Sequence, residues 1–143
     1  AVYRWLEDYD RAIEQYDRAL EINPENYWSW LNSGRSYAGK NHQNQAFLQY
    51  KRAAQVSPEQ PEAYYFQGES YVARGLFSEA IAPYRKAIAR DPQYGSAHVG
   101  LGKVYLFLDD CPQARFHFGQ ALVIDPYSLG AQEGLDACGA GQE

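Results

Sequence analysis

Apolar and small side chains recur along the chain at helical spacing, in segments that are separated by short polar stretches. From Tyr27 to about Lys40, the residues Trp30, Leu31 and Tyr37 fall on one face of a helix, and residues 44–56 show the same spacing. The separator GKNHQ, residues 39–43, is polar and short. These features predict two helices that fold back on each other as an antiparallel pair.

This pattern returns every 34 residues without an insertion or a deletion. Six columns hold the same or a similar residue: glycine at Gly34, Gly68 and Gly102; tyrosine at Tyr3, Tyr37, Tyr71 and Tyr105; alanine at Ala12, Ala46, Ala80 and Ala114; an aromatic ring at Tyr16, Tyr50, Tyr84 and Phe118; alanine at Ala19, Ala53, Ala87 and Ala121; and proline at Pro24, Pro58, Pro92 and Pro126. Agreement in one register over the whole chain identifies an internal repeat of helix pairs.

The glycine column lies inside the first helix of each pair. A glycine there costs a helix roughly 1 kcal/mol relative to alanine, so its recurrence needs a compensating contact. Helices that cross at the short end of the usual 8–10 Å range need small side chains at the crossing. We therefore predict that Gly34 and Ala46 allow a close crossing, with Trp30, Tyr37 and Tyr50 filling the space around it.

The columns W-x-x-x-G-x-x-Y, A-x-x-x-Y/F-x-x-A and P resemble the tetratricopeptide repeat, and the resemblance covers nearly the whole chain. It implies an all-α fold, a right-handed α-solenoid of antiparallel helix-turn-helix units. We expect a single domain, 1–143, made of a partial repeat 1–24, full repeats 27–60, 61–94 and 95–128, and a capping helix and tail 129–143. His98 departs from the large aromatic of the family, which predicts looser packing there.

The two ends of the array differ. Residues 127–138 lose the glycine and tyrosine columns, which is typical of the solvating helix that closes a repeat array. Residues 1–24 hold the end of a first helix and a complete second helix, so Ala12 and Tyr16 lack most of their cover. We expect the chain to be a fragment of a longer array, whose open N-terminal edge is available for self-association.

Composition and charge narrow the classes of partner. The chain has 143 residues, 45% of them apolar, and a net charge of −5. This acidity argues against nucleic acid, which needs a basic face. No apolar run approaches the roughly 20 residues that cross a bilayer, so we expect no membrane insertion. Cys111 and Cys138 are interpreted as free thiols, which favours a reducing compartment and a cytoplasmic location.

Catalytic chemistry has no recognisable set of residues. His42, His98 and His117 are expected in a turn, a first helix and a second helix, and none stands at a metal-ligand or triad spacing from a cysteine or carboxylate. The glycine columns lie inside helices and do not form a phosphate-binding loop. We predict a protein that is not an enzyme and that needs no metal or cofactor.

The resemblance implies a ligand-binding concave face lined by the first helices. Carried over residue by residue, the partner-binding groove is expected to use Trp28, Leu31, Arg35, Glu62, Tyr65, Glu69, Val99 and Lys103, together with Ser96, Ala38, Val72 and Leu106. Arg35, Glu69 and Lys103 either pair with one another as a surface ladder or contact the ligand. Trp28 and Tyr65 are the preferred anchors, although each can instead pack against an adjacent helix.

These observations favour a non-catalytic scaffold that binds a protein or peptide partner in the groove. The alternatives are a self-assembly element and a recruiting domain of a larger enzyme. Members of the family that bind chaperone tails clamp a terminal carboxylate. Asn32 can supply one clamp asparagine, but Glu62 and Phe66 stand where lysine and arginine are required, so a carboxylate clamp is not expected.

Overall fold

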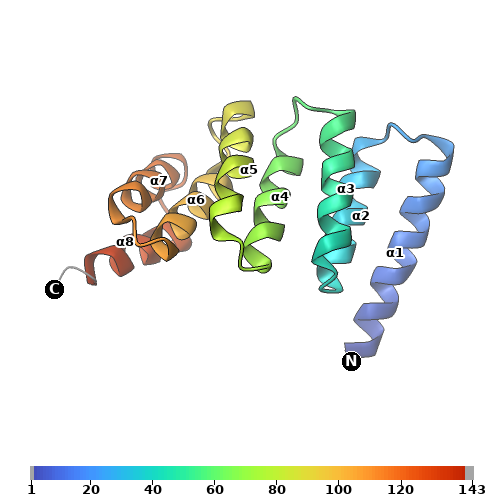
Figure 1. Cartoon of the computed structure of the whole chain (residues 1–143), viewed down its shortest axis with the longest axis horizontal. Helices are drawn as coiled ribbons and strands as arrows, with labels where there is room; N and C mark the ends of the chain where they lie inside the picture. The colour runs from blue at the N-terminus through green and yellow to red at the C-terminus, as the bar shows by residue number, and fades with distance from the viewer. Residues whose placement is uncertain (1, 141–143) are drawn as a thin grey trace.

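The computed structural model describes the backbone of residues 2–140 and the side chains of residues 6–140, and over this range the chain is built from α-helices without a strand (Figure 1). The helices are α1 Val2–Ile22, α2 Tyr27–Gly39, α3 Gln43–Val56, α4 Glu62–Ala73, α5 Phe77–Arg90, α6 Gly95–Phe107, α7 Cys111–Ile124 and α8 Leu129–Ala140. The all-α solenoid that the repeat pattern predicts is therefore confirmed.

The turns that join the helices of a pair share one backbone feature. Asn41, Gly75 and Asp109 have positive φ angles of 63°, 75° and 61°, and they stand 34 residues apart. Glycine, asparagine and aspartate tolerate this left-handed conformation better than other residues. The 34-residue period therefore extends to the hairpin turns, where three different residues meet the same backbone requirement.

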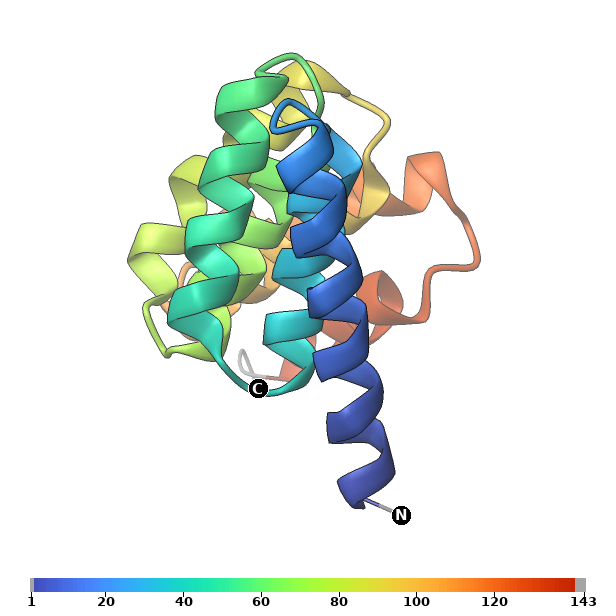
Figure 2. The same cartoon turned by 90° about the vertical axis from the view of Figure 1, so that its right-hand side faces the viewer.

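The N-terminal segment differs from the prediction. Residues 2–22 form one continuous helix of 21 residues, not the end of one helix followed by a turn and another helix. The residue at the turn position, 34 before Asn41, is Glu7, whose side chain disfavours the left-handed backbone that the turn requires. Without a residue that permits the turn, the helix continues, and its N-terminal end extends beyond the other helices in Figure 2.

The helices form an inner and an outer layer. Consecutive first helices, α2, α4, α6 and α8, contact one another along the array. Among the residues described, the second helices α1, α3, α5 and α7 contact only first helices. In one layer the neighbouring helices touch, and in the other they stand apart. An array of this kind curves toward the layer whose helices touch. The first helices therefore line the concave face.

The repeated glycines lie under the repeated aromatic rings. A Cβ atom on Gly34 would come within 2.4 Å of the Tyr50 ring, and one on Gly102 within 2.5 Å of the Phe118 ring. The sequence placed Tyr50 beside the helix crossing, whereas the structure places its ring directly on the glycine. Phe118 also lies on Gly134 of α8, where a Cβ would approach its ring to 2.2 Å. The ring is thus held between two helix backbones.

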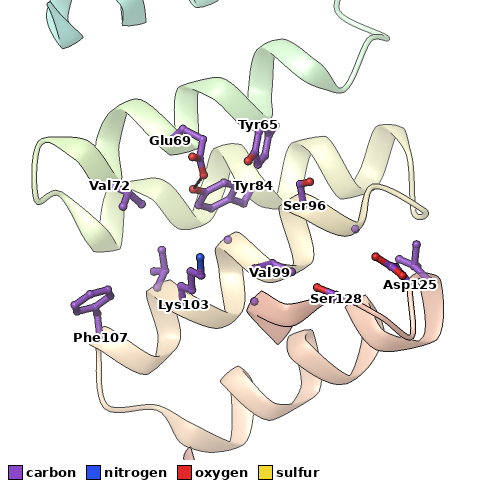
Figure 3. Close-up of a pocket in the computed structure, with 16 residues that line it drawn as sticks. Tyr65, Glu69, Val72, Tyr84, Ser96, Val99, Lys103, Phe107, Asp125 and Ser128 are labelled. Carbon is purple, nitrogen blue, oxygen red and sulfur yellow. Dashed lines mark hydrogen bonds between the residues drawn. The ribbon is translucent and has the colours of Figure 1, made fainter. Parts of the chain in front are cut away.

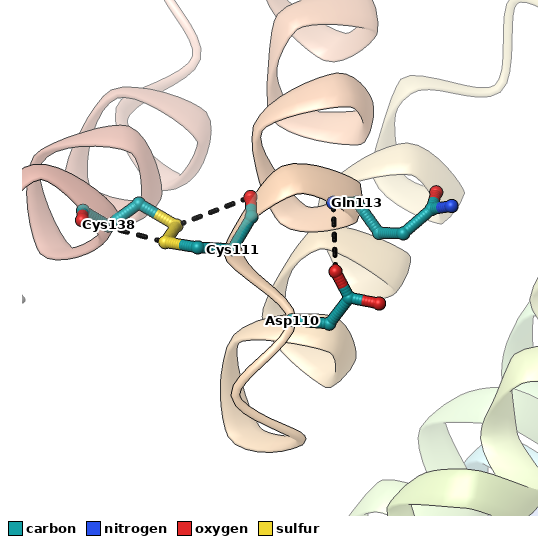
Figure 4. The surroundings of a disulfide bond; sticks show 4 residues. All are labelled: Asp110, Cys111, Gln113 and Cys138. Atoms are coloured by element: carbon teal, nitrogen blue, oxygen red, sulfur yellow. Dashed lines mark hydrogen bonds between the residues drawn. A yellow bond between two sulfur atoms is a disulfide. The ribbon is translucent and has the colours of Figure 1, made fainter.

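Cys111 and Cys138 are joined by a disulfide bond, so the interpretation of both as free thiols is wrong (Figure 4). The first residue of α7 and a residue near the end of α8 approach each other because α8 folds back along α7, with their Cα atoms 5.7 Å apart. The number and spacing of cysteines in a sequence do not show which helices pack together, so they could not reveal this contact between residues 27 apart. The bond removes the argument for a reducing compartment, and with it the basis of a cytoplasmic location.

Helix α8 packs against α7 and α6 at the C-terminal end of the array. Its buried residues are small, Ala131, Gly134 and Cys138, and its exposed residues include both polar side chains, such as Glu133 and Asp136, and the apolar Leu129. The predicted tail after the cap, residues 141–143, lies outside the residues described. The division into repeats at the bounds given above stays a prediction.

Candidate functional site

A cleft of about 590 Å³ opens between α4, α6, the end of α7 and the start of α8 (Figure 3). Its volume lies within the range of ligand-binding clefts. The residues that line it are Tyr65, Glu69 and Val72 from α4; Tyr84 from α5; Gly95, Ser96, Val99, Gly100, Lys103, Val104 and Phe107 from α6; Ala121 and Ile124 from the end of α7; Asp125 and Ser128 from the turn that follows; and Gly130 from α8.

The cleft is apolar at one end and more polar toward the other. Figure 3 shows Phe107 and Val72 at one end, and Ser96, Asp125 and Ser128 toward the other. The Phe107 ring stacks on Phe77, with ring centroids 4.5 Å apart, yet Phe107 stays 67% exposed. An exposed aromatic ring that is held in place by a neighbour is a suitable anchor for a ligand, because little side-chain entropy is lost on contact.

Tyrosine hydroxyls and one carboxylate lie on the α4 side of the cleft. The buried Tyr84 donates its hydroxyl proton to Glu69 Oε1 at 2.5 Å. Burial, followed by the nearby Glu69 carboxylate, raises the pKa of Tyr84 and of Tyr65 well above the ordinary value. Burial and the Glu62 and Glu69 carboxylates raise the pKa of Tyr94, whose ring lies 5.2 Å from that of Tyr65, to about 12. These hydroxyls therefore stay protonated and act as neutral hydrogen-bond donors.

Lys103 supplies the only basic side chain among the residues that line the cleft, and Glu69 and Asp125 supply the acids. Each acid has a partner, because Asp125 Oδ1 accepts a hydrogen bond from the Tyr127 amide at 3.0 Å. Within the described part of the chain, Lys103 forms neither a hydrogen bond nor an ion pair. The ladder predicted from Arg35 through Glu69 to Lys103 is therefore not formed.

The structure divides the predicted groove residues into three groups. One cleft is lined by six of them, namely Tyr65, Glu69, Val72, Ser96, Val99 and Lys103. Leu31 is only 2% exposed and lies in the core, so its prediction as a contact residue is wrong. It belongs to the same buried cluster as Tyr50 and Ala53 of α3.

The cleft does not include the predicted residues Trp28, Arg35, Glu62, Ala38 and Leu106. Trp28 is 53% exposed, and its ring meets that of Tyr27 edge-on. The guanidinium of Arg35 lies over the Phe66 ring, 5.2 Å from its centroid. Glu62 accepts a hydrogen bond from the Tyr27 hydroxyl at 3.3 Å. Their part in partner binding stays a prediction.

Sequence reasoning missed three of the residues at the two ends of the cleft, namely Phe107, Asp125 and Ser128. Phe107 lines it, whereas the predicted Leu106 packs against the core. The signal for Phe107 was present, because it follows Lys103 by four residues and so shares its helix face. Asp125 and Ser128 come from the turn between α7 and α8, and columns built from first helices alone could not include them.

A second feature on α6 and α7 is a buried histidine pair. His98 and His117 are 6% and 9% exposed, and their Nδ1 atoms lie 3.4 Å apart. Tyr105 stacks on His117 and accepts a hydrogen bond from the Arg85 guanidinium. The looser packing expected at His98 is therefore not observed. Burial, then His98 and Arg85, lowers the pKa of His117 to about 4.

The histidine pair predicts a loss of stability in acid. The unfolded chain binds a proton at His117 near its ordinary pKa of 6.5, but the folded chain does so only near 4. The free energy of unfolding should therefore fall as pH drops from about 6.5 to about 4, by at most about 1.4 kcal/mol per pH unit from this group. The free energy of unfolding, measured with urea, should depend less steeply on pH in His117→Phe, a variant that keeps a ring on Tyr105.

The exposed His42 provides the control, because His42→Gln should keep the pH dependence of the unsubstituted chain. Carboxylates that titrate in the same range contribute equally to all three proteins, so the difference between them isolates His117. An unchanged slope in His117→Phe would contradict this account of the pair.

The described residues also lack two features that other functions would need. They contain no group of three histidine, cysteine or acidic side chains placed to hold a metal ion. None of the helices in this part of the chain has the length and apolar character needed to cross a membrane.

Comparison with known proteins gives two matches to family models. Residues 68–108 match a model described as TPR repeat, and residues 1–26 match one described as tetratricopeptide repeat. The fold is similar to that of two crystal structures of MamA, both 26% identical in sequence. One has a TM-score of 0.86 and covers 95% of this chain and 80% of that chain; for the other the values are 0.85, 95% and 74%.

A third similar structure is the first TPR of Spaghetti (RPAP3) bound to the HSP90 peptide SRMEEVD. It is 17% identical, has a TM-score of 0.79, and the alignment covers 81% of this chain and 92% of that one. At this identity the likeness shows the fold alone. No curated protein sequence matches the chain.

Proposed function

The chain is a tetratricopeptide-repeat protein, and we propose that it is a non-catalytic scaffold that binds a segment of a partner protein in the cleft of its concave face. In this proposal the partner-binding residues are Tyr65, Glu69, Val72, Val99, Lys103 and Phe107. The repeats act as a rigid frame, and no metal or cofactor takes part.

One observation carries the proposal, namely the exposed apolar surface within the cleft. Phe107 is 67% exposed, and the half-buried Val72 and Val99 line the same cleft. Apolar side chains that a fold holds in a concavity together with a few polar groups are typical of ligand sites. The structural neighbour described as bound to an HSP90 peptide gives the proposal further support, because it holds a peptide on the same fold.

Phe107→Ala tests this site, with Phe116→Ala as the matched control. Both rings are well exposed, at 67% and 57%, and they lie on the adjacent helices α6 and α7, but only Phe107 lines the cleft. Loss of an anchor ring should weaken partner binding at least tenfold, or about 1.4 kcal/mol. Affinity capture from cells that make the protein should identify partners that the unsubstituted chain and Phe116→Ala retain and Phe107→Ala loses.

Circular dichroism should show equal helical content in the three proteins. Partners that bind Phe107→Ala as well as the unsubstituted chain would exclude this cleft as the binding site. A partner set lost only from Phe116→Ala would place the site on the outer face instead.

A second candidate function, self-assembly, rests on α1. Ala12, Tyr16 and Ala19 are half-buried, whereas their repeat equivalents in α3 are at most 2% exposed. A second copy that packs on this face of α1 would bury the remaining apolar surface. Sedimentation equilibrium at high protein concentration tests the idea, since a monomer throughout would exclude it.

A further inference from the structure

Three cleft residues form a ridge along one face of α6. Val99, Lys103 and Phe107 stand at intervals of four residues, and all three line the cleft. Side chains spaced in this way are neighbours on a helix, with about 6 Å between successive Cβ atoms. The ridge therefore presents an apolar group, a cation and a second apolar group in a row.

An extended peptide has nearly the same spacing. Its residues rise about 3.3 Å each, and alternate side chains share a face, so those two residues apart lie about 6.6 Å from each other. The cleft volume of about 590 Å³ holds only about one turn of a helix that is 10–12 Å across. An extended segment thus fits the space better than a helix does, and the spacing of its side chains is close to that of the ridge.

The charged groups of the cleft determine which charge is favoured on the central side chain of such a segment. Three charged groups line the cleft: the Glu69 carboxylate accepts a hydrogen bond from the Tyr84 hydroxyl, the Asp125 carboxylate accepts one from a backbone amide, and the Lys103 ammonium has no partner among the residues described. A carboxylate of the partner would complement Lys103. Further acids nearby would be repelled by Glu69 and Asp125, which excludes a densely acidic tail.

From this arrangement, and resting on the proposed function, we infer that the partner segment is extended and carries a single aspartate or glutamate flanked two residues away on each side by bulky apolar side chains. The carboxylate pairs with Lys103, one apolar side chain packs on Phe107 and Val72, and the other packs on Val99. A charge-assisted pair sets the register, while the apolar contacts supply most of the affinity.

A charge reversal tests the inference directly. A phage-displayed library of random dodecapeptides is selected on the full chain, on Lys103→Glu, and on Lys51→Glu, which makes the same change at an exposed position on α3. The unsubstituted chain and Lys51→Glu should select a single acid between apolar residues at the second position on each side. Lys103→Glu should bind those peptides at least tenfold more weakly and should select lysine or arginine at the central position.

Lys103→Gln provides a second measurement, in which the preference for an acid should vanish without a gain of basic peptides. Peptides that lose affinity for Phe107→Ala but show no charge preference, or keep the same preference in Lys103→Glu, would overturn the inference and leave the proposed function standing. Should no selected peptide lose affinity for Phe107→Ala, both the inference and the proposed function would fall.

Discussion

Replacement of both Cys111 and Cys138 by alanine should lower the free energy of unfolding of the C-terminal helices by about 3 to 4 kcal/mol. The expected size follows from the loop of 27 residues that the disulfide closes, because a cross-link stabilises mainly by restricting the unfolded chain. Neighbouring units of a repeat array share stability only through their interfaces, so the loss should concentrate in α7 and α8. Hydrogen exchange should show the amides of α8 losing protection first.

The weak apolar packing of α8 explains why it should depend on the bond. Apart from Cys138, it buries only Ala131 and Gly134, and it also contains the glycines at 130 and 139, which disfavour a helix. A dithiol reductant provides the control, since it should destabilise the unsubstituted chain and leave the alanine variant unchanged. If complete reduction, verified by thiol titration, left the exchange of α8 unaltered, the disulfide would have no structural role.

Gly102→Ala should destabilise the fold by about 1 to 3 kcal/mol, although alanine is the better helix former by roughly 1 kcal/mol. The added Cβ would lie 2.5 Å from the Phe118 ring, which is completely buried. The ring has no free direction of movement, because Gly134 of α8 lies against it as well. Chemical denaturation of the variant measures the loss.

Gly119→Ala makes the same chemical change where the space is open. Gly119 lies inside α7, and apart from its chain neighbours and the backbone of its own helix nothing comes within 4 Å of an added Cβ. Here only the helix propensity changes, and the free energy of unfolding of the variant should rise by about 0.5 to 1 kcal/mol. Opposite signs for the two glycines are expected; destabilisation of similar size at both positions would show that the aromatic contact does not matter.

Much of the fold could be predicted from the 34-residue period, because each repeat column reports one packing contact. Tyr50, Tyr84 and Phe118 are each at most 2% exposed, as expected of a shared core position. The pattern failed where a single residue decided the backbone. Glu7 at a turn position allowed α1 to continue as one helix. The repeated alanine and aromatic columns do not include this position, so they could not reveal the missing turn.

The candidate site was less predictable, because it depends on which helix faces combine. Tyr65 and Lys103 could be placed on the concave face from their columns, and the structure puts both in the cleft. Leu31 occupies the same column as Tyr65 but is buried, since neighbours differ from repeat to repeat. The wall formed by Ile124 and Asp125, and the disulfide that holds α8 near it, required the three-dimensional arrangement.

The most direct test of partner binding on the concave face is an NMR titration of the labelled chain with a library-selected peptide. Shift changes should concentrate at Val72, Val99, Lys103 and Phe107, while the exposed faces of α3 and α5 stay unchanged. Changes centred on the outer helices, with these four residues unaffected, would contradict the assignment of the cleft as the binding site.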